Sequence, residues 1–394
     1  MDVVDILIVL VLVAAAAHGL RLGALVQVLS FGGFLAGLTV GALVANAVAP
    51  SLHSANLRAA VALVLVIGLG IVVGVAGRVV GGIGTAAMRR RRLAGVGLGI
   101  FDSAAGLAVA VVAALVSIWL VTNELAQTRY ATLSGAVQES HIVRAVDAVM
   151  PPLPDFFSRI QSLLDSSGFP PVFSQLEPRL AKAPPPTSGQ AQRLAAPAMA
   201  STVKVLGQAC GYLQEGSGFV AAPSTVVTNA HVVAGEPSTT VVVAGTSYVA
   251  TVVLFTPTFD LAVLRTDAPL GPPLAIDPGT VAHGTAAAIV GYPENGSLAV
   301  GPAAVDGAIT AQGRNIYNQG TVTRQVYQID AKVQPGNSGG PLVAAGGKVI
   351  GVVFSRSTAY PDVGYALTSP GVLSRVDQAA SRSAPAPTGS CTSG

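Results

Sequence analysis

Charged side chains are scarce in this sequence. Asp, Glu, Lys and Arg make up 10% of its 394 residues, whereas they make up about 25% of an average soluble protein. Hydrophobic residues reach 51%, which excludes a disordered chain and argues against a single ordinary cytosolic domain. Aromatic residues are few, at 5%, and the 45 glycines lack the Gly-X-Y period of collagen. The length leaves room for two or three domains.

The few charges are unevenly distributed along the chain. Residues 1–121 contain seven arginines, three aspartates and no lysine. From Thr122 onward, 15 basic and 16 acidic residues nearly cancel. The net charge of +3 is therefore not the basic surface of a nucleic-acid-binding protein, and we expect no nucleic-acid partner.

The N-terminal part consists of four apolar runs, which cover residues 3–17, 22–49, 57–83 and 93–121. A helix that spans a bilayer needs about 20 apolar residues. The last three runs meet this length, and the first meets it if it continues to Leu20. A cleaved signal peptide fits the first run poorly, because Asp2 and Asp5 occupy the region where a signal peptide is positively charged. The sequence predicts an α-helical membrane bundle of four spans, with the lipid bilayer as a partner.

Four consecutive arginines, Arg89–Arg92, lie between the third and fourth runs. Positive residues in short loops remain on the cytoplasmic side of a membrane. This rule predicts a multi-pass protein of the inner (plasma) membrane. Its N-terminus, and everything after Thr122, would then lie on the periplasmic or extracytoplasmic side.

Within the runs, glycines recur every four residues, at positions 33, 37 and 41, at 70 and 74, and at 95 and 99. Small residues at this spacing let helices pack closely in lipid. Asp102, near the start of the fourth run, is a functional candidate because ionisable groups in a membrane are costly. A hydrogen bond to a neighbouring helix, or pairing with Arg78, is the structural alternative. By span count, glycine pattern and this aspartate, the region resembles the colicin V production (CvpA-like) family.

Residues 122–198 have a lower density of apolar residues. Amphipathic helices are expected over 140–149 and 155–164, and the proline-rich stretch 184–189 is typical of a linker. We expect a semi-rigid tether between two domains, with no catalytic chemistry of its own. Its Pro/Ser-rich end is a candidate processing site.

After Met199 the pattern changes to short Val/Thr-rich runs bounded by Gly and Pro, which predicts an all-β barrel or sandwich. Three short stretches within it carry candidate chemistry: Thr-Asn-Ala-His at 228–231, Asp-Leu-Ala-Val-Leu at 260–264, and Gly-Asn-Ser-Gly-Gly-Pro at 336–341. Each alone is typical of an ordinary turn or strand end. Together they provide a base, a carboxylate and a hydroxyl in the order His231, Asp260, Ser338, one of the orders that a catalytic triad takes.

These stretches resemble the trypsin/chymotrypsin-fold serine proteases, especially the HtrA-like branch. The resemblance covers about residues 216–370. It implies a double β-barrel with Ser338 as nucleophile, His231 as general base and then acid, and Asp260 as the orienting carboxylate. The backbone N–H groups of Gly336 and Ser338 would form the oxyanion hole. No cofactor and no metal ion are expected.

Two departures from that family affect the expected specificity. About fifty residues follow Ser338, which leaves no room for the PDZ domain of typical HtrA proteases. Lys332 lies six residues before the serine, where trypsin-like enzymes carry an acidic residue that selects basic side chains. A preference for Lys or Arg substrates is therefore not expected, and Asp330 resembles the aspartate of the HtrA-like segment rather than a specificity charge.

Cys210 and Cys391 are the only cysteines, and both fall on the predicted outer side. They could be two free structural thiols. An oxidising exterior and an even count favour a disulfide between them. Such a bond would tie the start of the protease domain to its C-terminal tail.

We therefore expect a four-span membrane domain over 1–121, a helical and proline-rich linker over 122–198, and a trypsin-like protease domain over 199–394. This arrangement is similar to periplasmic membrane serine proteases of mycobacteria that are linked to acid resistance. The resemblance implies a serine endopeptidase that cleaves protein substrates of the cell envelope under acid or oxidative stress. The alternative is a CvpA-like scaffold or transport-associated protein whose outer domain senses or binds. The sequence does not indicate the oligomeric state.

Overall fold

A computed structural model describes residues 2–48, 55–90, 96–126, 130–150, 169–170, 172–174, 176–178, 180–209 and 211–392. Its internal contacts divide the chain into two units, Met1–Asp165 and Ser166–Gly394. The expected linker over 122–198 is thus shared between the two units rather than standing apart from them.

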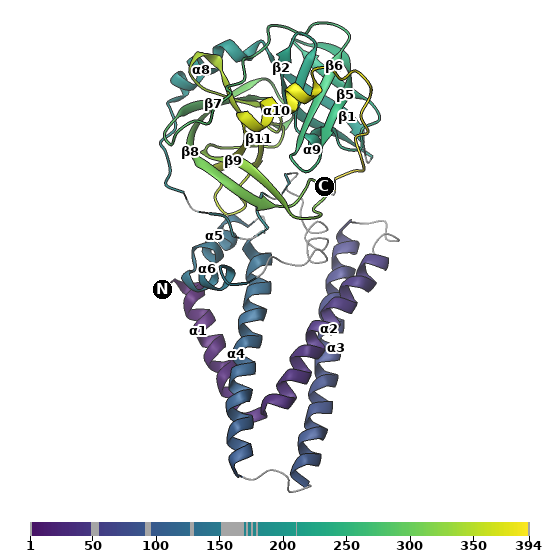
Figure 1. Cartoon of the computed structure of the whole chain (residues 1–394), viewed down its shortest axis with the longest axis vertical. Helices are drawn as coiled ribbons and strands as arrows, with labels where there is room; N and C mark the ends of the chain where they lie inside the picture. Colours follow the sequence, from purple (N-terminus) through teal and green to yellow (C-terminus); the bar gives the residue numbers. More distant parts are fainter. Residues whose placement is uncertain are drawn as a thin grey trace. The chain divides into compact units, whose positions relative to one another are not determined.

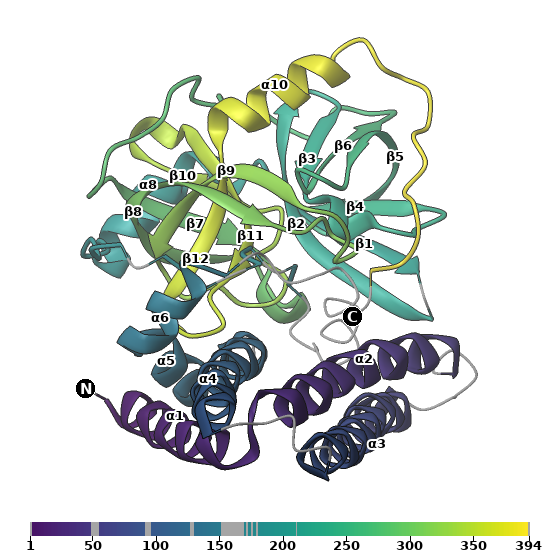
Figure 2. The same cartoon turned by 60° about the horizontal axis from the view of Figure 1, so that its bottom comes forward.

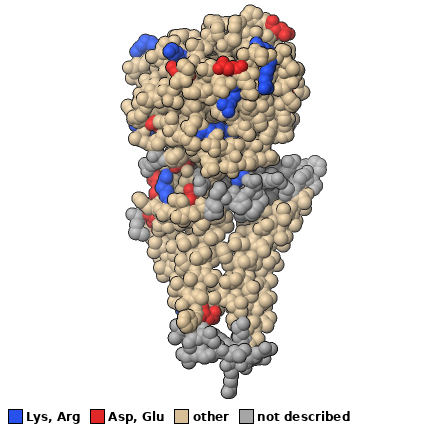
Figure 3. Space-filling model, viewed as in Figure 1, with Lys and Arg blue, Asp and Glu red and all other residues tan. Residues whose placement is uncertain are grey.

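The first unit contains four long helices, α1 (Val3–Leu22), α2 (Ala24–Val48), α3 (Ala55–Arg90) and α4 (Val96–Ala126). Each is long and apolar enough to cross a membrane. In Figure 3 the sides of these helices carry almost no charged residues, whereas the barrels of the second unit carry scattered charges of both signs. The four spans predicted from the sequence are confirmed as helices.

The helices of this unit pack mainly as two pairs, α2 with α3 and α1 with α4 (Figures 1 and 2). Glycines make the α2–α3 contact possible. A Cβ atom added at Gly33 would lie 2.7 Å from the carbonyl oxygen of Val73, and one added at Gly41 would lie 2.6 Å from that of Leu65. Any side chain at these positions would push the helices apart, as the four-residue glycine spacing predicts.

Asp102 performs a structural task in this unit. Its Oδ1 atom accepts a hydrogen bond of 3.0 Å from the backbone N–H of Ala24, in the first turn of α2. The N-terminus of a helix leaves N–H groups without intrahelical partners, and a carboxylate there satisfies one of them. Of the interpretations that the sequence left open, a hydrogen bond to a neighbouring helix is the one that the structure contains.

Two short helices, α5 (Ala131–Glu139) and α6 (His141–Asp147), follow α4. Ser140 caps α6 by accepting a hydrogen bond from the N–H of Val143, and its hydroxyl donates to Asp5 at 2.6 Å. The amphipathic helix expected over 140–149 is therefore largely present. The second, expected over 155–164, lies outside the described residues.

The second unit contains two closed, antiparallel six-stranded barrels (Figure 2). The strands of the first barrel are β1 (Thr202–Ala209), β2 (Tyr212–Ala222), β3 (Thr225–Thr228), β4 (Thr239–Val243), β5 (Thr246–Thr256) and β6 (Leu261–Thr266). Those of the second are β7 (Ala286–Gly291), β8 (Ala299–Gly313), β9 (Val322–Asp330), β10 (Pro341–Val343), β11 (Val349–Arg356) and β12 (Val363–Thr368). Their cores consist largely of buried Val, Ala, Leu and Ile side chains. The predicted double β-barrel is confirmed.

Helix α8 (Ser188–Met199) covers part of the second barrel, in a region expected to be a linker. Thr187 and Gln190 form a capping box that begins the helix. Ala191, Ala195 and Ala198 repeat at helical spacing and are fully buried. Three alanines form a weak apolar stripe in a sequence, and the preceding prolines favour a linker, but here the small side chains let the helix lie close to the barrel.

The C-terminal tail lies along the first barrel. Helix α10 (Ser369–Ala379) is followed by an extended stretch in which Ala386 donates its N–H to the carbonyl of Val252 at 2.7 Å. Farther on, the carbonyl of Thr388 accepts a hydrogen bond of 3.0 Å from the N–H of Gly235. The tail therefore contacts the loop that follows the His231 segment.

Candidate active site

The three candidate catalytic residues lie on short segments beside barrel strands. His231 belongs to a single helical turn, α9 (Ala230–Val233), directly after β3. Asp260 lies in the tight turn between β5 and β6, and Ser338 lies in the loop between β9 and β10. The histidine and the aspartate thus come from the first barrel and the serine from the second.

Asp260 and His231 form a buried pair. The Oδ2 and Oδ1 atoms of Asp260 lie 2.8 and 3.0 Å from Nδ1 of His231. Oδ1 also accepts a hydrogen bond of 3.0 Å from the backbone N–H of His231. The aspartate is completely buried, and the histidine is 9% exposed. This carboxylate therefore fixes both the position and the ring orientation of the imidazole.

Ser338 is 2% exposed, and its place relative to the first barrel is fixed through its backbone. Its carbonyl accepts a hydrogen bond of 2.8 Å from the N–H of Ser217 on β2. Among the buried polar atoms that lack a hydrogen-bond partner in the described part of the chain are Oγ of Ser338 and Nε2 of His231. The structure thus brings His231 and Asp260 into contact and leaves the hydrogen bond between His231 and Ser338 unformed. Catalytic hydrogen bonds often tighten only when substrate binds.

Ser217 positions the serine loop, a role that the sequence did not reveal. Its hydroxyl donates to the carbonyl of Gly336 at 2.6 Å and accepts a hydrogen bond of 2.8 Å from the N–H of Tyr292. Its own carbonyl accepts a hydrogen bond of 2.7 Å from the hydroxyl of Thr228, three residues before His231. The Gly-Ser-Gly stretch at 216–218 carried the family resemblance, but these three contacts come from distant segments and leave no local signal.

The serine loop requires glycine at position 336. Gly336 has a φ of +87°, and an added Cβ atom would lie 2.9 Å from the backbone nitrogen of Glu294. The preceding carbonyl, that of Pro335, accepts a hydrogen bond of 2.8 Å from the same nitrogen. Because the C=O and N–H of a trans peptide point in opposite directions, the N–H of Gly336 points away from Glu294.

The two charged residues before the serine loop differ in their surroundings. Lys332 is exposed. Asp330 lies 4.0 Å from the ammonium of Lys182, and burial raises the pKa of its carboxyl group while Lys182 lowers it. Val333, between Lys332 and the loop, is buried and lies against Gly364 of β12.

Of the two cysteines, Cys210 lies outside the described residues. Cys391 lies against Gly235, where an added Cβ atom would be 3.1 Å from its backbone nitrogen. Gly235 lines a surface pocket together with Ala209 and Gly211, the two neighbours of Cys210. The pairing of the two cysteines stays a prediction.

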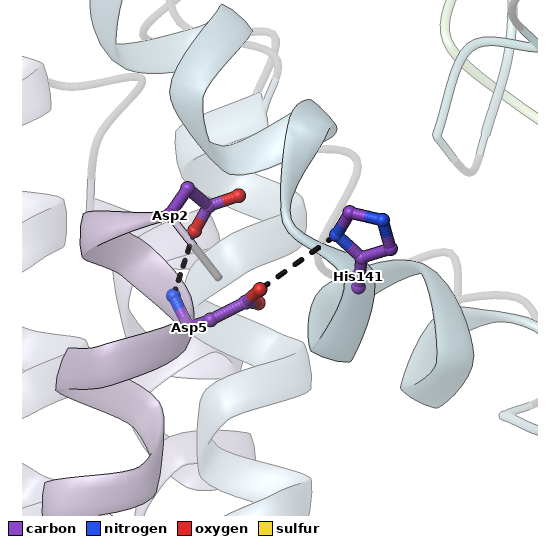
Figure 4. Close-up of side chains that lie close together, drawn as sticks. All are labelled: Asp2, Asp5 and His141. Atoms are coloured by element: carbon purple, nitrogen blue, oxygen red, sulfur yellow. Dashed lines mark hydrogen bonds and ion pairs between the residues drawn. The ribbon is translucent and has the colours of Figure 1, made fainter.

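Among the described residues, one cluster has metal-ligand spacing: Asp2, Asp5 and His141 (Figure 4). It belongs to the membrane unit and not to the barrels. The Oδ1 atom of Asp5 accepts hydrogen bonds from the hydroxyl of Ser140 and from the N–H of Ile142 at 3.2 Å, and Oδ2 lies 3.7 Å from His141. These contacts hold the start of α1 to the start of α6, so we treat the cluster as structural.

Two six-stranded barrels, one with a buried Asp–His pair and the other with a glycine-rich serine loop, define a protease of the trypsin fold. Residues 216–352 match a family model described as a trypsin-like peptidase domain, and residues 4–151 match one described as a colicin V production protein. Serine protease Rv3671c of Mycobacterium tuberculosis, also called MarP, is 34% identical over 99% of this chain and 98% of its own length. The chain belongs to the same family of serine proteases with a membrane-spanning N-terminal domain.

Other relatives match the barrels alone. A Do-like HtrA serine protease of Lactococcus lactis is 34% identical over 42% of this chain and 44% of its own length. The crystal structure of the active form of the Rv3671c protease from M. tuberculosis is 35% identical. It covers 55% of this chain and 96% of that chain, with a TM-score of 0.53. These matches confirm the expected resemblance to HtrA-like proteases and to the mycobacterial enzyme. The protein is thus a serine protease with four candidate membrane spans.

Proposed function

We propose that this protein is a membrane-anchored, extracytoplasmic serine endopeptidase that uses Ser338, His231 and Asp260 as a catalytic triad. The observation that carries the proposal is the buried contact of 2.8 Å between the Asp260 carboxylate and Nδ1 of His231. It is supported by the glycine-rich Ser338 loop and by a relative named as a serine protease that matches the whole chain.

The Asp260–His231 pair prepares the base. An ionised carboxylate at Nδ1 keeps the proton on that nitrogen, which leaves Nε2 free to accept one. Nε2 would then take the proton of the Ser338 hydroxyl as Oγ attacks the scissile carbonyl. The imidazolium would return this proton to the leaving amine, and a water molecule would release the acyl group by the same steps. The partner-free Nε2 and Oγ atoms are the two that this reaction requires.

The oxyanion that forms during attack needs N–H donors that are fixed in advance. We assign this role to the N–H groups of Gly336 and Ser338. The N–H groups of Glu294 and Gly340 hold the carbonyl groups of Pro335 and Asn337, which share their peptides with these two donors. With both carbonyls held, the intervening backbone has little freedom to turn its donors away. The stabilisation of the oxyanion would therefore cost little reorganisation.

The location of the reaction follows from the arginines between the third and fourth spans. Positive-inside orientation would place residues 89–92 in the cytoplasm and the barrels on the periplasmic or extracytoplasmic side of the inner membrane. The substrates would then be proteins of the cell envelope. A role in resistance to acid or oxidative stress is carried over from the resemblance to the mycobacterial enzymes.

The Cys210–Cys391 disulfide belongs to the same proposal. An oxidising exterior permits it, and the neighbours of both cysteines lie around one pocket. The bond would fasten the C-terminal tail beside the loop Gly235–Pro237, which follows the His231 turn. We expect it to stabilise the first barrel.

The match of residues 4–151 to colicin V production proteins favours a second function, a membrane scaffold or transport-associated role of the helices. Complementation of a deletion strain by Ser338→Ala separates the two. If proteolysis is the function, the variant is expressed in the membrane at wild-type level and fails to complement. If it complements fully, the helices carry the function and the barrels serve as a sensing or binding module.

A further inference from the structure

The segment that leads from the membrane unit into the barrels lies against the second barrel. We call the described residues between Phe169 and Ala183 the strap. From its sequence this region was expected to be a tether without chemistry. In the structure it carries a glutamate, Glu177, that is only 7% exposed. The residues that Glu177 contacts either follow β11 or lie on β12. This part of the second barrel is close in space to the loop that carries Ser338.

Glu177 accepts hydrogen bonds with both carboxylate oxygens. Oε2 accepts from the hydroxyl of Ser357 and from that of Tyr365 at 2.9 Å. Oε1 accepts from the N–H and hydroxyl of Thr358, at 3.1 and 3.2 Å. One carboxylate thus holds three residues from both sides of the β11–β12 loop, residues 357–362.

The rest of the strap contacts the same part of the barrel. The carbonyl of Pro170 accepts a hydrogen bond of 2.8 Å from the hydroxyl of Ser355 at the end of β11. The ring of Phe173 meets that of Tyr365 edge-on at 5.4 Å. At the far end, Lys182 forms an ion pair with Asp362. The strap therefore contacts both ends of the loop.

This loop and the strand before it, β11, are joined by backbone hydrogen bonds to the segments that precede and follow Ser338. On β11, Val353 accepts from the N–H of Gly339 at 2.8 Å and donates to the carbonyl of Gly340 at 3.0 Å. At the other end, Asp362 accepts from the N–H of Ala331 at 2.8 Å, at the start of the segment that leads to Ser338. A displacement of the loop would therefore reach the serine loop from two sides.

A carboxylate is costly to bury unless donors surround it. Burial raises the pKa of Glu177, and its hydrogen bonds to Ser357, Thr358 and Tyr365 oppose that shift. Removal of the carboxylate would deprive these three residues of this acceptor, and two of them, Ser357 and Tyr365, are buried, so the loop would have reason to rearrange. An ordinary linker does not need a buried carboxylate. The presence of Glu177 therefore indicates a role that involves the β11–β12 loop.

We propose that Glu177 is a positioning residue for the protease reaction, which sets the β11–β12 loop as a wall of the substrate-binding site beside Ser338. The stretch that joins the membrane unit to the barrels would thereby control substrate binding. This inference rests on the proposed function, since it assumes that Ser338 is the nucleophile. It predicts an effect on substrate binding that is separable from the reactivity of the serine.

The test uses the full chain in detergent, with Glu177→Ala and Glu177→Gln compared with wild type. Ser174→Ala is the matched control, because Ser174 lies on the strap but bonds to the carbonyl of Gln312 on β8. Four quantities are measured: KM and kcat for a peptide substrate, the rate of labelling by a small fluorophosphonate, and the thermal unfolding midpoint. The fluorophosphonate reports serine reactivity with little demand on the binding site.

For Glu177→Ala we expect KM to rise and kcat/KM to fall by about tenfold or more, while labelling stays within about threefold of wild type. Glu177→Gln retains one acceptor oxygen and should recover most of the loss. Ser174→Ala should resemble wild type. Wild-type kinetics in a folded Glu177→Ala would overturn the proposal, as would equal losses of labelling, kcat and thermal stability, which indicate a merely structural role. A wild-type chain that neither cleaves nor labels would instead contradict the proposed function.

Discussion

At the scale of single residues, the candidate site depends on how firmly Asp260 is held. Its backbone adopts a φ of +66°, which is uncommon for a residue other than glycine. Two hydrogen bonds of 2.8 Å hold this conformation, one from the N–H of Asp260 to the carbonyl of Thr256 and one from the side chain of Asn229 to the carbonyl of Asp260. The carboxylate is thereby aimed at His231 before any substrate arrives, as a preorganised catalytic site requires.

Replacement of this carboxylate tests the role that we assign to it. In Asp260→Asn the amide no longer favours the tautomer with the proton on Nδ1 of His231. We expect kcat to fall by about 10⁴-fold with little change in fold, as the loss of the orienting carboxylate does in other triads. Peptide kinetics and a circular dichroism spectrum check this. A kcat within tenfold of wild type would show that Asp260 does not orient the base.

A second residue-scale prediction concerns Glu236, in the loop after the His231 turn. The pKa of its carboxyl group is raised to about 7 by burial, which outweighs the opposing effect of a hydrogen bond from Thr239. The folded state therefore binds this proton more tightly than the unfolded state, in which the carboxyl group has its ordinary pKa of 4.5. The resulting stability is present at pH below 4.5 and is lost as the pH rises through about 7.

Glu236→Gln should remove this pH dependence, because the amide is neutral at every pH. We expect the thermal midpoint of the wild-type barrels to fall between pH 5 and pH 8 by more than that of the variant. Differential scanning fluorimetry of both proteins across this range measures the difference. Parallel curves for the two proteins would contradict the assignment.

At the scale of elements, the described tail and the strap both cross barrel surfaces to reach the neighbourhood of the site. The tail contacts Gly235 beside the His231 turn, and the strap contacts the β11–β12 loop beside the Ser338 loop. Each barrel thus has an extended segment fastened to a loop that adjoins a segment with candidate catalytic residues. Elements outside the barrels therefore contribute to the geometry of the site.

The tail gives a prediction about the two cysteines. If Cys210 and Cys391 are bonded, Cys210→Ser, Cys391→Ser and the double variant all remove the same cross-link. Each should lose about 2–4 kcal/mol of stability, and the double variant should lose no more than either single one. Denaturant unfolding under non-reducing conditions measures all three. Additive losses, or no loss in any variant, would indicate that the two cysteines are not bonded to each other.

Most of the helices and strands could be predicted from the sequence. Particular elements show why the others could not. The four spans are long apolar runs, and the barrel strands are short Val/Thr-rich runs between turns, so local pattern defines them. Helix α8 and the strap are different. Their buried residues, such as Ala195 and Glu177, are small or charged, and their burial depends on barrel strands that are distant in sequence.

The residues of the candidate site also differ in whether the sequence could predict them. His231, Asp260 and Ser338 lie in recognisable short motifs, so the sequence alone identifies them as candidates, and their roles stay predictions. The Gly-Ser-Gly stretch around Ser217 does not reveal its role, and Glu177 lies in no motif, because the partners of both are hydroxyl and backbone groups from other segments. The linker interpretation of residues 184–189 missed that Thr187 begins a helix, since proline-rich stretches are common both in linkers and just before helices.

At the scale of the whole molecule, a single chain contains four apolar spans and a protease domain. The spans contain few charged residues, and the arginines at 89–92 provide the signal for their orientation. A near-neutral pair of barrels would then lie outside the cytoplasm. The small net positive charge of the protein is thus a signal of membrane topology.

Reporter fusions test this topology. Alkaline phosphatase, which is active only outside the cytoplasm, should be active when fused after Val149 and inactive when fused after Arg92. Replacement of the four arginines by asparagine should reduce the activity of the Val149 fusion, because the charge bias that orients the spans is removed. Activity at both fusion points, or at Arg92 alone, would contradict the predicted orientation.

The central claim is that Ser338 is a nucleophile activated by His231 and Asp260. Labelling of the full chain with a fluorophosphonate probe tests it most directly, because the probe reacts only with an activated serine. We expect the wild-type protein to be labelled at Ser338, Ser338→Ala to remain unlabelled, and His231→Ala to react far more slowly, each with an unchanged unfolding midpoint. A wild-type protein that stays unlabelled, or labelling that persists in Ser338→Ala, would contradict the account.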